Sequence, residues 1–510
     1  MKCSFASLLL AAAGVLTVNA QTSPGLEWER AFGGTNADFA HVVKSTSDGG
    51  SIVAGYSFSD ISGNKTSASQ GGGDCWMVKL DAGGNKQWER SFGGTELDRV
   101  NDVQQTSDGG YIVGSTSHSG ISGNKTSASL GGADYWVLKL DANGNKQWER
   151  SFGGSQVDDL RAVQQTSDGG FVLGGFSASS VSGNKTSAAF GSAGDYWIVK
   201  LDANGNKQWD KTYGGTDADE LHAVQQTIDG GFIVGGHSFS ITSGNKISAT
   251  LGSGTSDSWV LKLDASGNKQ WERCYGGADS EQLHSIQQTS DGGYALGGTS
   301  YSSVSAGKSS GSHGSHDYWV VKIDAAGAVQ WDQSFGGIDA DELHSVQQTG
   351  DGGYLLGGVS FSGISGNKTS TSSGSHAGDY WMVKLDASGN KQWEQAARGS
   401  FAGEILRLQL TGDDGYIVAG LSSSAAQAEP DYAIAKLRGP LRLDAYSMVA
   451  PGVFQTRAAA ITGHDYVLEA STNLTQWAAV QTQRAVNGSV SFSHASVPGT
   501  PKYFYRVKQL

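Results

Sequence analysis

Carboxylate and imidazole side chains recur at fixed distances after a Gly-Gly pair in this chain of 510 residues. An acidic residue stands four positions after the pair, and a histidine, asparagine or arginine stands seven positions after it. The acidic residues are Asp38, Asp98, Asp158, Asp219, Glu281 and Asp341, and the second set is His41, Asn101, Arg161, His222, His284 and His344. Carboxylates beside imidazoles can bind a metal ion or carry out acid–base chemistry.

A structural role is the alternative for both sets. Each aspartate would accept hydrogen bonds from its own loop, and each histidine would bond to nearby backbone. Both sets recur in successive copies of a repeated unit. If these units form a ring, a binding site near its central axis is usually asymmetric, so residues that recur in every copy are more consistent with the structural interpretation. The candidates for ligand binding are His41, Arg161, His222, His284, His344, Asp219, Glu220, Asp341 and Glu342.

Aromatic residues occupy one position of a long Ser/Gly-rich segment in several copies. Such rings can stack on the C–H face of a sugar or anchor a protein partner, and the structural alternative is packing under the long loop. The candidates for ligand binding are Phe58, Phe239, Tyr301 and Phe361, with His118 at the same position in another copy. Three more histidines, His313, His316 and His376, are too scattered to define a metal site.

No established catalytic motif is present. The sequence has no nucleophile elbow, no phosphate-binding glycine loop, no His-Glu-x-x-His and no clustered Cys/His site. We therefore assign no catalytic residue, no metal ligand and no cofactor. The formal net charge of −13 disfavours nucleic acid and anionic membranes as partners. Cys75 and Cys274 stand at different repeat positions, so we expect two free thiols.

The first twenty residues have the features of a secretory signal peptide. Lys2 precedes the apolar run at 5–18, and small residues precede a cut between Ala20 and Gln21. The apolar run is short for a membrane span, and no later stretch is apolar enough to be one. We expect the mature chain to be secreted or held at the cell surface.

A unit of about sixty residues recurs seven times. It is marked by an Asp-Gly-Gly turn whose aspartates are spaced 60 to 62 residues apart: Asp48, Asp108, Asp168, Asp229, Asp291, Asp351 and, in a degenerate copy, Asp413. Within the second copy, four strand-like pieces lie at 102–107, 111–115, 135–141 and 146–152. Short Gly/Asn turns join the first to the second and the third to the fourth. Seven units of four antiparallel strands predict a seven-bladed β-propeller.

Two observations favour a closed ring over a solenoid of stacked units, which is the structural alternative. The third strand of each unit is apolar on both faces, as expected for a blade covered on both sides. The repeats also begin with a lone fourth strand at 26–34 and end on a third strand at 432–439. The N-terminal strand would therefore complete the last blade. Lysines such as Lys79 and Lys139, near the end of this third strand, are expected to cover apolar surface with their stems.

The order of these motifs resembles kelch-type propellers across residues 26–438. Gly-Gly pairs in segments such as "VLGGFS" are followed by "DYW" and then by "NKQW". The "TSDGG" turn is similar to the Asp-box hairpin of sialidase-type propellers, where the motif is structural. After residue 440, "YVLEASTNL" and "FYRV" resemble the fibronectin-like β-sandwich modules of secreted proteins from Verrucomicrobia. We expect a signal peptide at 1–20, a propeller at 21–439 and a small β-sandwich at 440–510.

The links between the fourth and first strands, and the long loops between the second and third, emerge on one face of such a ring. Varied loops on a rigid scaffold are where binding residues concentrate. The first hypothesis is therefore a secreted, monomeric, non-catalytic binding, adhesion or scaffold protein that takes a carbohydrate or protein on this face. The alternatives are a glycan-active hydrolase or lyase that uses the acidic links, and a structural protein of the cell envelope.

Overall fold

The computed structural model of the chain is built from β-strands. It describes residues 25–305, 307–371, 378–397, 405–413, 415–422 and 429–438, and outside these 7–11, 14–18, 443–450, 453–459, 465–471, 476, 478–484, 486, 489–495 and 504–509. No helix occurs in these ranges, and so none has the length and apolar character needed to cross a membrane. Contacts divide the chain into two compact units: Leu26–Leu437, and Met1–Gly25 together with Arg438–Leu510.

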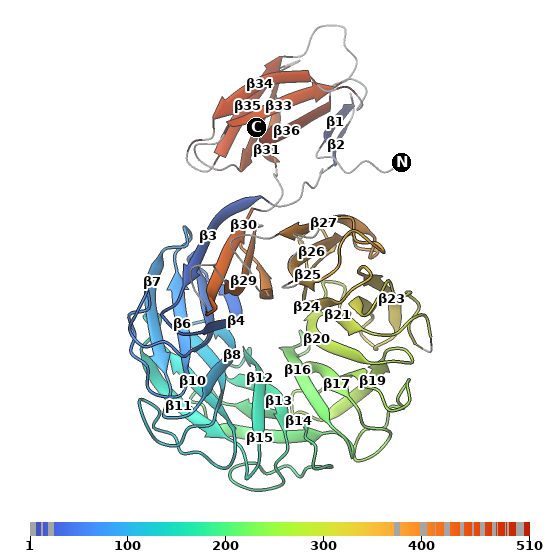
Figure 1. Ribbon diagram of the computed structural model, residues 1–510. Coiled ribbons are helices and arrows are strands. Elements are labelled where there is room, and N and C mark those ends of the chain that lie inside the picture. The colour runs from blue at the N-terminus through green and yellow to red at the C-terminus, as the bar shows by residue number, and fades with distance from the viewer. Residues whose placement is uncertain are drawn as a thin grey trace. The chain divides into compact units, whose positions relative to one another are not determined.

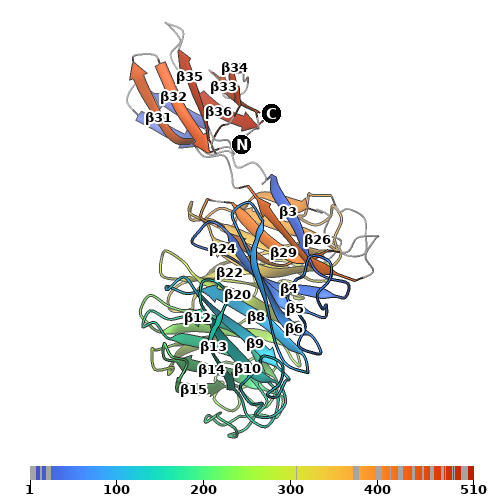
Figure 2. The same cartoon turned by 90° about the vertical axis from the view of Figure 1, so that its left-hand side faces the viewer.

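The first unit is a ring of seven antiparallel four-stranded sheets, seen along its axis in Figure 1 and from the side in Figure 2. Blade 1 contains β4 (Asp38–Ser45), β5 (Ser51–Ser57), β6 (Asp74–Leu80) and β7 (Lys86–Phe92). Blade 2 contains β8 (Asp98–Gln105), β9 (Tyr111–Ser117), β10 (Asp134–Leu140) and β11 (Lys146–Phe152). Blade 3 contains β12 (Asp158–Gln165), β13 (Phe171–Ser177), β14 (Asp195–Leu201) and β15 (Lys207–Tyr213).

The remaining blades follow the same order. Blade 4 contains β16 (Asp219–Gln226), β17 (Phe232–Ser238), β18 (Asp257–Leu263) and β19 (Lys269–Tyr275). Blade 5 contains β20 (Glu281–Gln288), β21 (Tyr294–Ser300), β22 (Asp317–Ile323) and β23 (Val329–Phe335). Blade 6 contains β24 (Asp341–Gln348), β25 (Tyr354–Ser360), β26 (Asp379–Leu385) and β27 (Lys391–Ala397). Blade 7 contains β28 (Ile405–Leu410), β29 (Tyr416–Ser422), β30 (Asp431–Leu437) and β3 (Leu26–Phe32).

The ring closes where the sequence predicted. Strand β3 pairs antiparallel with β30, from Leu26 opposite Leu437 to Phe32 opposite Tyr432. In Figure 1 the blue β3 lies beside the orange β30. This pairing confirms the seven-bladed propeller and excludes a solenoid, because the last blade borrows its fourth strand from the opposite end of the repeat region.

Hydrophobic cores lie between adjacent blades. The third strand of every blade is buried along its whole length, as in β10 and β14. One core joins Met77 of blade 1 to Trp136 of blade 2, and another joins Ile434 of blade 7 to Trp76 of blade 1. Each blade therefore has two apolar faces because it has two neighbours, which explains the near-continuous apolar third strands in the sequence.

The lysine near the end of each third strand has a charged partner that the sequence did not indicate. Lys79 Nζ lies 2.8 Å from Asp48 Oδ2 of the Asp-Gly-Gly turn and also donates to the Leu80 carbonyl. Antiparallel pairing brings the end of the third strand beside this turn, so the ammonium group has a charged partner, and the covering of apolar surface by the lysine stem stays a prediction. The same ion pair recurs in the other blades as Lys139–Asp108, Lys200–Asp168, Lys262–Asp229, Lys322–Asp291, Lys384–Asp351 and Lys436–Asp413.

The first strand of each blade is innermost, as the labels of β4, β8, β12, β16, β20 and β24 around the centre of Figure 1 show. Glutamines link these inner strands through side-chain acceptors. Gln164 Oε1, for example, accepts a hydrogen bond of 2.5 Å from the Gln226 backbone N–H of the next blade. Together the inner strands enclose a cavity of about 490 Å³ whose lining includes Gln104, Gln164, Gln225, Gln287, Gln347 and Gln409.

The second unit contains two further sheets. One has the order β2-β1-β36-β33-β34 and the other β31-β32-β35. The strands are β1 (Ser7–Ala11), β2 (Gly14–Val18), β31 (Leu443–Ala450), β32 (Val453–Ala459), β33 (Asp465–Ser471), β34 (Ala478–Arg484), β35 (Ser489–Ala495) and β36 (Phe504–Gln509). The strands of 443–509 agree with the β-rich C-terminal region expected from the sequence, and its assignment as a sandwich stays a prediction. Cys75 and Cys274 are both free in the described structure.

Candidate functional site

A β-bulge positions the residues that stand seven places after the Gly-Gly pair. In each of blades 1 to 6 the pairing between the first two strands shifts by one residue at this position, so the residue has no partner across the ladder. Bulges of this kind redirect a side chain and are common next to functional sites. The bulge residues are His41, Asn101, Arg161, His222, His284 and His344.

These bulge residues form an arc at one end of the central cavity. The cavity lining begins one position after the bulge, at Asp102 and Ser285, and ends four positions after it, at Ser45 and Gln105. Neighbouring members of the arc contact one another: the ring centroids of His222 and His284 are 5.3 Å apart, and those of His284 and His344 are 5.6 Å apart. The structure therefore brings this set together where the inner strands meet.

Blades 1 to 3 engage their bulge residues in structural contacts. His41 Nδ1 donates to the Val100 carbonyl of the next blade at 3.1 Å. Asn101 Nδ2 donates to the Leu160 carbonyl at 2.6 Å. Arg161 pairs with Asp159 at 3.0 Å. Asp159 also accepts from Arg99 at 2.6 Å and from Thr116 Oγ1 at 2.6 Å. This side of the arc is thus a hydrogen-bonded network across blades.

The bulge residues of blades 4 to 6 are all histidines. Burial lowers the pKa of His344 to about 4, and it lowers the pKa values of His222, His284 and His237 below the usual 6.5. These rings are therefore neutral at pH 7, and a neutral imidazole has one ring nitrogen with a free lone pair. The sevenfold pattern breaks here, because imidazoles cluster on one side of the arc.

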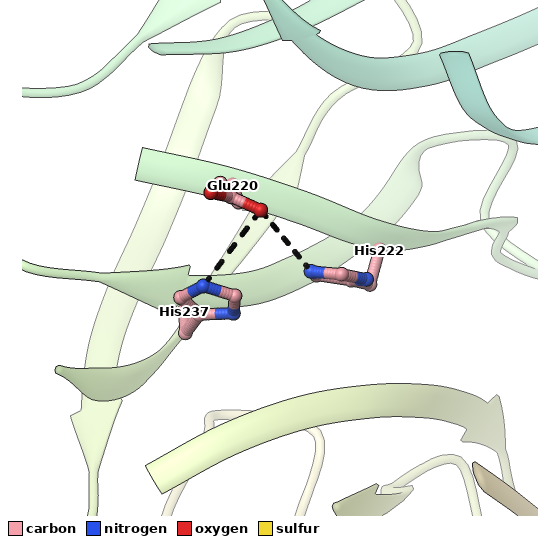
Figure 3. Close-up of side chains that lie close together, drawn as sticks. All are labelled: Glu220, His222 and His237. Atoms are coloured by element: carbon pink, nitrogen blue, oxygen red, sulfur yellow. Dashed lines mark ion pairs between the residues drawn. The ribbon is translucent and has the colours of Figure 1, made fainter. Parts of the chain in front are cut away.

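Within this part, three side chains of blade 4 converge, as shown in Figure 3. Glu220 Oε2 lies 3.9 Å from His222 Nε2 and 3.9 Å from His237 Nε2. One donor atom from each residue lies within 4.8 Å of the other two. His237 is 8% exposed, and its ring stacks on that of His222 with centroids 5.1 Å apart. This set of donors has the composition of a three-ligand metal centre.

Sequence reasoning missed His237. It stands on the second strand, in "IVGGHS", at a position that holds Tyr56, Thr116, Phe176, Thr299, Val359 and Leu421 in the other blades. The signal was its departure from the repeat together with its register. The ladder places His237 directly opposite Glu220, and residues directly opposite on an antiparallel pair have Cβ atoms about 4.5–5.5 Å apart.

A second carboxylate, Glu342 of blade 6, separates two imidazoles. Its Oε1 lies 3.5 Å from His316 Nε2, and its Oε2 lies 4.0 Å from His344 Nε2. His316 precedes β22 of blade 5, and its ring lies 4.5 Å from that of Tyr301. His313 is instead hydrogen-bonded to Asn367, with the two nitrogen atoms 2.9 Å apart. His376 lies outside the described residues.

Asp219 and Asp341 are the first residues of β16 and β24. Both are completely buried. Asp219 Oδ2 accepts from the Gly215 backbone N–H at 2.8 Å and from Ser240 Oγ at 2.9 Å, and Asp341 makes the equivalent contacts. Their carboxylates hold the link between blades, as in the structural alternative. Of the four acidic candidates, Glu220 and Glu342 remain accessible, with side chains 34% and 42% exposed.

The aromatic candidates lie at the same end of the propeller as the bulge residues. Phe58 is 41% exposed, Phe239 41% and Tyr301 39%, whereas Phe361 is partly buried. The backbone N–H of each donates to a carbonyl of the link before the first strand of its own blade, as from Phe239 to Ala218 at 2.9 Å. Phe239 is 5.9 Å from His237 between ring centroids, and His237 in turn stacks on His222 of the arc.

Comparison with known proteins yields limited similarity. No family model matches the sequence. Over 199 residues the chain is 26% identical to the regulatory protein FlaEY of Caulobacter vibrioides, and the match covers 37% of this chain and 20% of that protein. The match thus spans about a fifth of the length of this curated relative.

Among solved structures, a protein of unknown function from Dyadobacter fermentans is 12% identical, with a TM-score of 0.42 over 81% of this chain and 99% of that one. A puromycin hydrolase is 10% identical, with a TM-score of 0.44 over 84% of this chain and 60% of that one. These similarities assign the chain neither a family nor an activity.

Proposed function

We propose that the protein is a binding propeller that takes a carbohydrate on the face carrying the inter-blade links and the long loops. The observation that supports this function is the juxtaposition of exposed rings with accessible polar groups. Phe239 adjoins His237, which stands opposite the accessible Glu220. Tyr301 adjoins His316, which pairs with the accessible Glu342. Flat apolar surface with a few convergent polar groups is the usual composition of a small-ligand site.

The chemistry of these groups suits a sugar. Phe58, Phe239 and Tyr301 are between 39% and 41% exposed, and in the proposed complex their exposed ring surface contacts the C–H face of a pyranose. The carboxylates of Glu220 and Glu342 can accept hydrogen bonds from hydroxyl groups. Stacking one ring against a sugar buries enough apolar area to contribute about 1 kcal/mol.

A glycan array followed by calorimetry on the best ligand tests this proposal. Replacing Phe239 or Tyr301 by alanine is expected to weaken binding about fivefold each, because each removes one stacking surface. Val329→Ala is a matched control, since Val329 is an exposed apolar residue of an outer strand. Absence of binding to any glycan, or equal losses in the control, would refute the proposal.

A protein partner is the second candidate. Branched aliphatic residues are exposed in the long loops of blades 1 to 6, three residues after the aromatic position in blades 1, 2, 3, 5 and 6 and two residues after it in blade 4. They are Ile61, Ile121, Val181, Ile241, Val304 and Ile364, between 60% and 69% exposed. Exposed apolar surface of this kind often marks interaction sites. Replacing Ile121, Val181 and Ile241 together by serine would abolish capture of a protein ligand and leave glycan binding unchanged.

Because Asp219 and Asp341 are buried, fewer acidic residues are left for the alternative function as a glycan-active enzyme. Such an enzyme would have to use Glu220 and Glu342 as its pair of carboxylates. Turnover of the array ligand by the wild-type chain, lost in Glu342→Gln, would replace the binding proposal with this one. A structural envelope role instead predicts that substitutions of the loop residues change neither binding nor any phenotype.

We also propose secretion with removal of residues 1–20, and a spacing or attachment role for a β-sandwich at 440–510. The signal-like sequence around Lys2 and the strand-rich C-terminal unit support these roles. Intact mass of the protein recovered from the culture medium tests the first, with Gln21 expected at the N-terminus. The kelch-like and Asp-box-like character of the repeats is likewise a proposal, supported by the hairpin around Asp108.

A further inference from the structure

Three potential metal-binding atoms of blade 4, one each from Glu220, His222 and His237, lie close together without forming hydrogen bonds to one another. We propose that Glu220, His222 and His237 bind one divalent transition-metal ion, of which Zn²⁺ is the representative, and leave a fourth coordination position for a water or ligand atom. This inference goes beyond carbohydrate binding and does not depend on it.

The backbone brings these ligands together. Glu220 and His237 are directly opposite in the ladder between β16 and β17. His222 follows Glu220 by two residues, which is the spacing of side chains on one face of a strand. The bulge at His222 frees this residue from the ladder. All three ligands thus come from two hydrogen-bonded strands of a rigid blade rather than from loops.

The distances suit a metal ion better than direct hydrogen bonds. Both imidazole nitrogens lie 3.9 Å from the same carboxylate oxygen, Glu220 Oε2. Hydrogen bonds from N–H to oxygen span about 2.7–3.2 Å. Ligands of a tetrahedral ion with bonds of about 2.0–2.1 Å lie about 3.3 Å apart. The two nitrogen–oxygen distances are therefore about half an ångström longer than this spacing, and all three donor atoms lie within 4.8 Å of one another.

His222 also has an unmet hydrogen-bonding atom. Its Nε2 is buried and has no hydrogen-bond partner in the described structure. At the equivalent bulge position His41 donates to the Val100 carbonyl, and Asn101 donates to the Leu160 carbonyl. A buried polar atom without a protein partner is one that a bound ion or water can satisfy.

The neighbouring blades show why one site is expected. Blade 6 repeats the same Asp-Glu-Leu-His sequence, but Val359 stands opposite Glu342, and His316 and His344 lie on different oxygens of that carboxylate. Blade 5 has His284, but Gln282 and Thr299 replace the other two ligands. Of the described residues, only Glu220, His222 and His237 form a group with metal-binding spacing.

The ligand types select the class of ion. Two imidazoles and one carboxylate suit Zn²⁺, Fe²⁺, Co²⁺ or Ni²⁺, whereas Ca²⁺ and Mg²⁺ prefer sites made of oxygen atoms. Imidazole–carboxylate sets also occur in zinc enzymes with an open position. The Glu220 side chain is 34% exposed, so the site has access to solvent.

The test is metal binding by the full chain, purified without a histidine tag and stripped with a chelator. Calorimetric titration with Zn²⁺ is expected to show one tight site per chain, and Co²⁺ is expected to give the visible absorption bands of a low-coordinate cobalt centre. Each ligand is replaced by the residue that another blade carries at that position: Glu220→Gln, His222→Asn and His237→Thr. Each variant is expected to lose affinity by more than about a hundredfold, beyond the loss typical of removing an outer-shell partner.

Two matched variants control for the imidazoles and carboxylates nearby. Glu342→Gln alters the same motif in blade 6, and His41→Asn alters the bulge residue of blade 1. Both are expected to retain Zn²⁺ affinity within about twofold, and melting curves of the metal-free variants establish that each folds. Absence of tight Zn²⁺ binding by the wild-type chain would overturn the proposal, as would an equal loss in Glu342→Gln or full affinity in His237→Thr. Since no sugar is present, failure here leaves the carbohydrate proposal untouched.

Discussion

The hydroxyl of Tyr432 donates a hydrogen bond of 2.9 Å to the backbone carbonyl of Trp76, and so joins the last blade to the first. The same bond links other neighbouring blades, as from Tyr196 to Trp259 at 2.9 Å. Closure of the ring therefore uses the contact that already repeats between blades. The chain needs no special closing device beyond the strand that β3 supplies to blade 7.

Loss of this closing bond should be measurable. Tyr432→Phe keeps the ring packed against Trp76 but removes the donor, and we expect it to lower the free energy of unfolding by about 1 kcal/mol. Denaturant melts compare it with Tyr301→Phe, which removes a hydroxyl from an exposed ring. Equal stability of the two variants would contradict a role for the Tyr432 bond in closure.

Removal of β3 should open blade 7. A chain that starts at Gly33 leaves β30 with one unpaired edge and deprives the core between blades 7 and 1 of Phe32 and Trp28. We expect a lower melting temperature and proteolytic cleavage first within 405–437. A chain that starts at Gly25 retains β3 and is the control. A synthetic peptide of residues 26–32 should partly restore resistance to protease, and unaltered resistance without it would argue against this role of β3.

Stability should decline as the pH rises from about 4 to 7. Burial, with the nearby carboxylate of Asp219, raises the pKa of Asp195 to about 7 from an ordinary 3.8. A folded-state pKa above the unfolded value gives stability that is complete below about pH 4 and is lost as the pH rises through 7. In Asp195→Asn, the loss in the free energy of unfolding over this pH range should be smaller than in the wild type, by on the order of 1–4 kcal/mol. Melting temperatures measured across this pH range test this prediction, and Asp202→Asn, on an exposed turn, is the control. Parallel curves of melting temperature against pH for Asp195→Asn and the wild type would contradict the role of Asp195.

At lower pH, protonation of the aspartates in the Asp-Gly-Gly turns should reduce the stability of the protein. Partial burial opposes ionisation of Asp108, but hydrogen bonds from Lys139, Thr106 and the Gly110 backbone lower its pKa to about 2. Its contribution is therefore present above about pH 4 and lost as the pH falls through 2. Because the side chain is half exposed, Asp108→Asn should cost about 1 kcal/mol or less at pH 7. The same variant should show a shallower loss of stability between pH 4 and 2 in urea melts, and a loss as steep as that of the wild type would count against this assignment.

The sequence was sufficient to predict the propeller because each blade is a local structure. Most strands pair with partners within about thirty residues along the chain, and the turns that join them carry the glycines they require. Gly84, at a positive φ of 77°, lies beneath the Trp28 ring of the preceding blade, where a Cβ atom would come within 2.7 Å. Recurrence of these local signals identified the blades, and the unpaired strands at the two ends predicted closure.

The individual side-chain roles were less accessible to the sequence. Recurrence correctly favoured a structural role for Asp219, but it gave no reason to separate Glu220 from its buried neighbour. The aspartate partners of the lysines in the third strands were not predicted, because they lie about thirty residues earlier in the chain and come into contact only through strand pairing. His237 was overlooked because its significance depends on standing opposite Glu220 in the ladder.

The sequence by itself determined the number of blades, their strand order and the face that carries the varied loops, since hydrophobic periodicity and turn chemistry act over short distances along the chain. Only the tertiary structure decided which imidazoles meet. His222 and His284 come together because their strands lie side by side around one axis, and His316 reaches Glu342 from the preceding blade. Such contacts join residues of different blades, so they depend on the curvature of the ring, which no single repeat contains, as well as on the bulge of each inner strand.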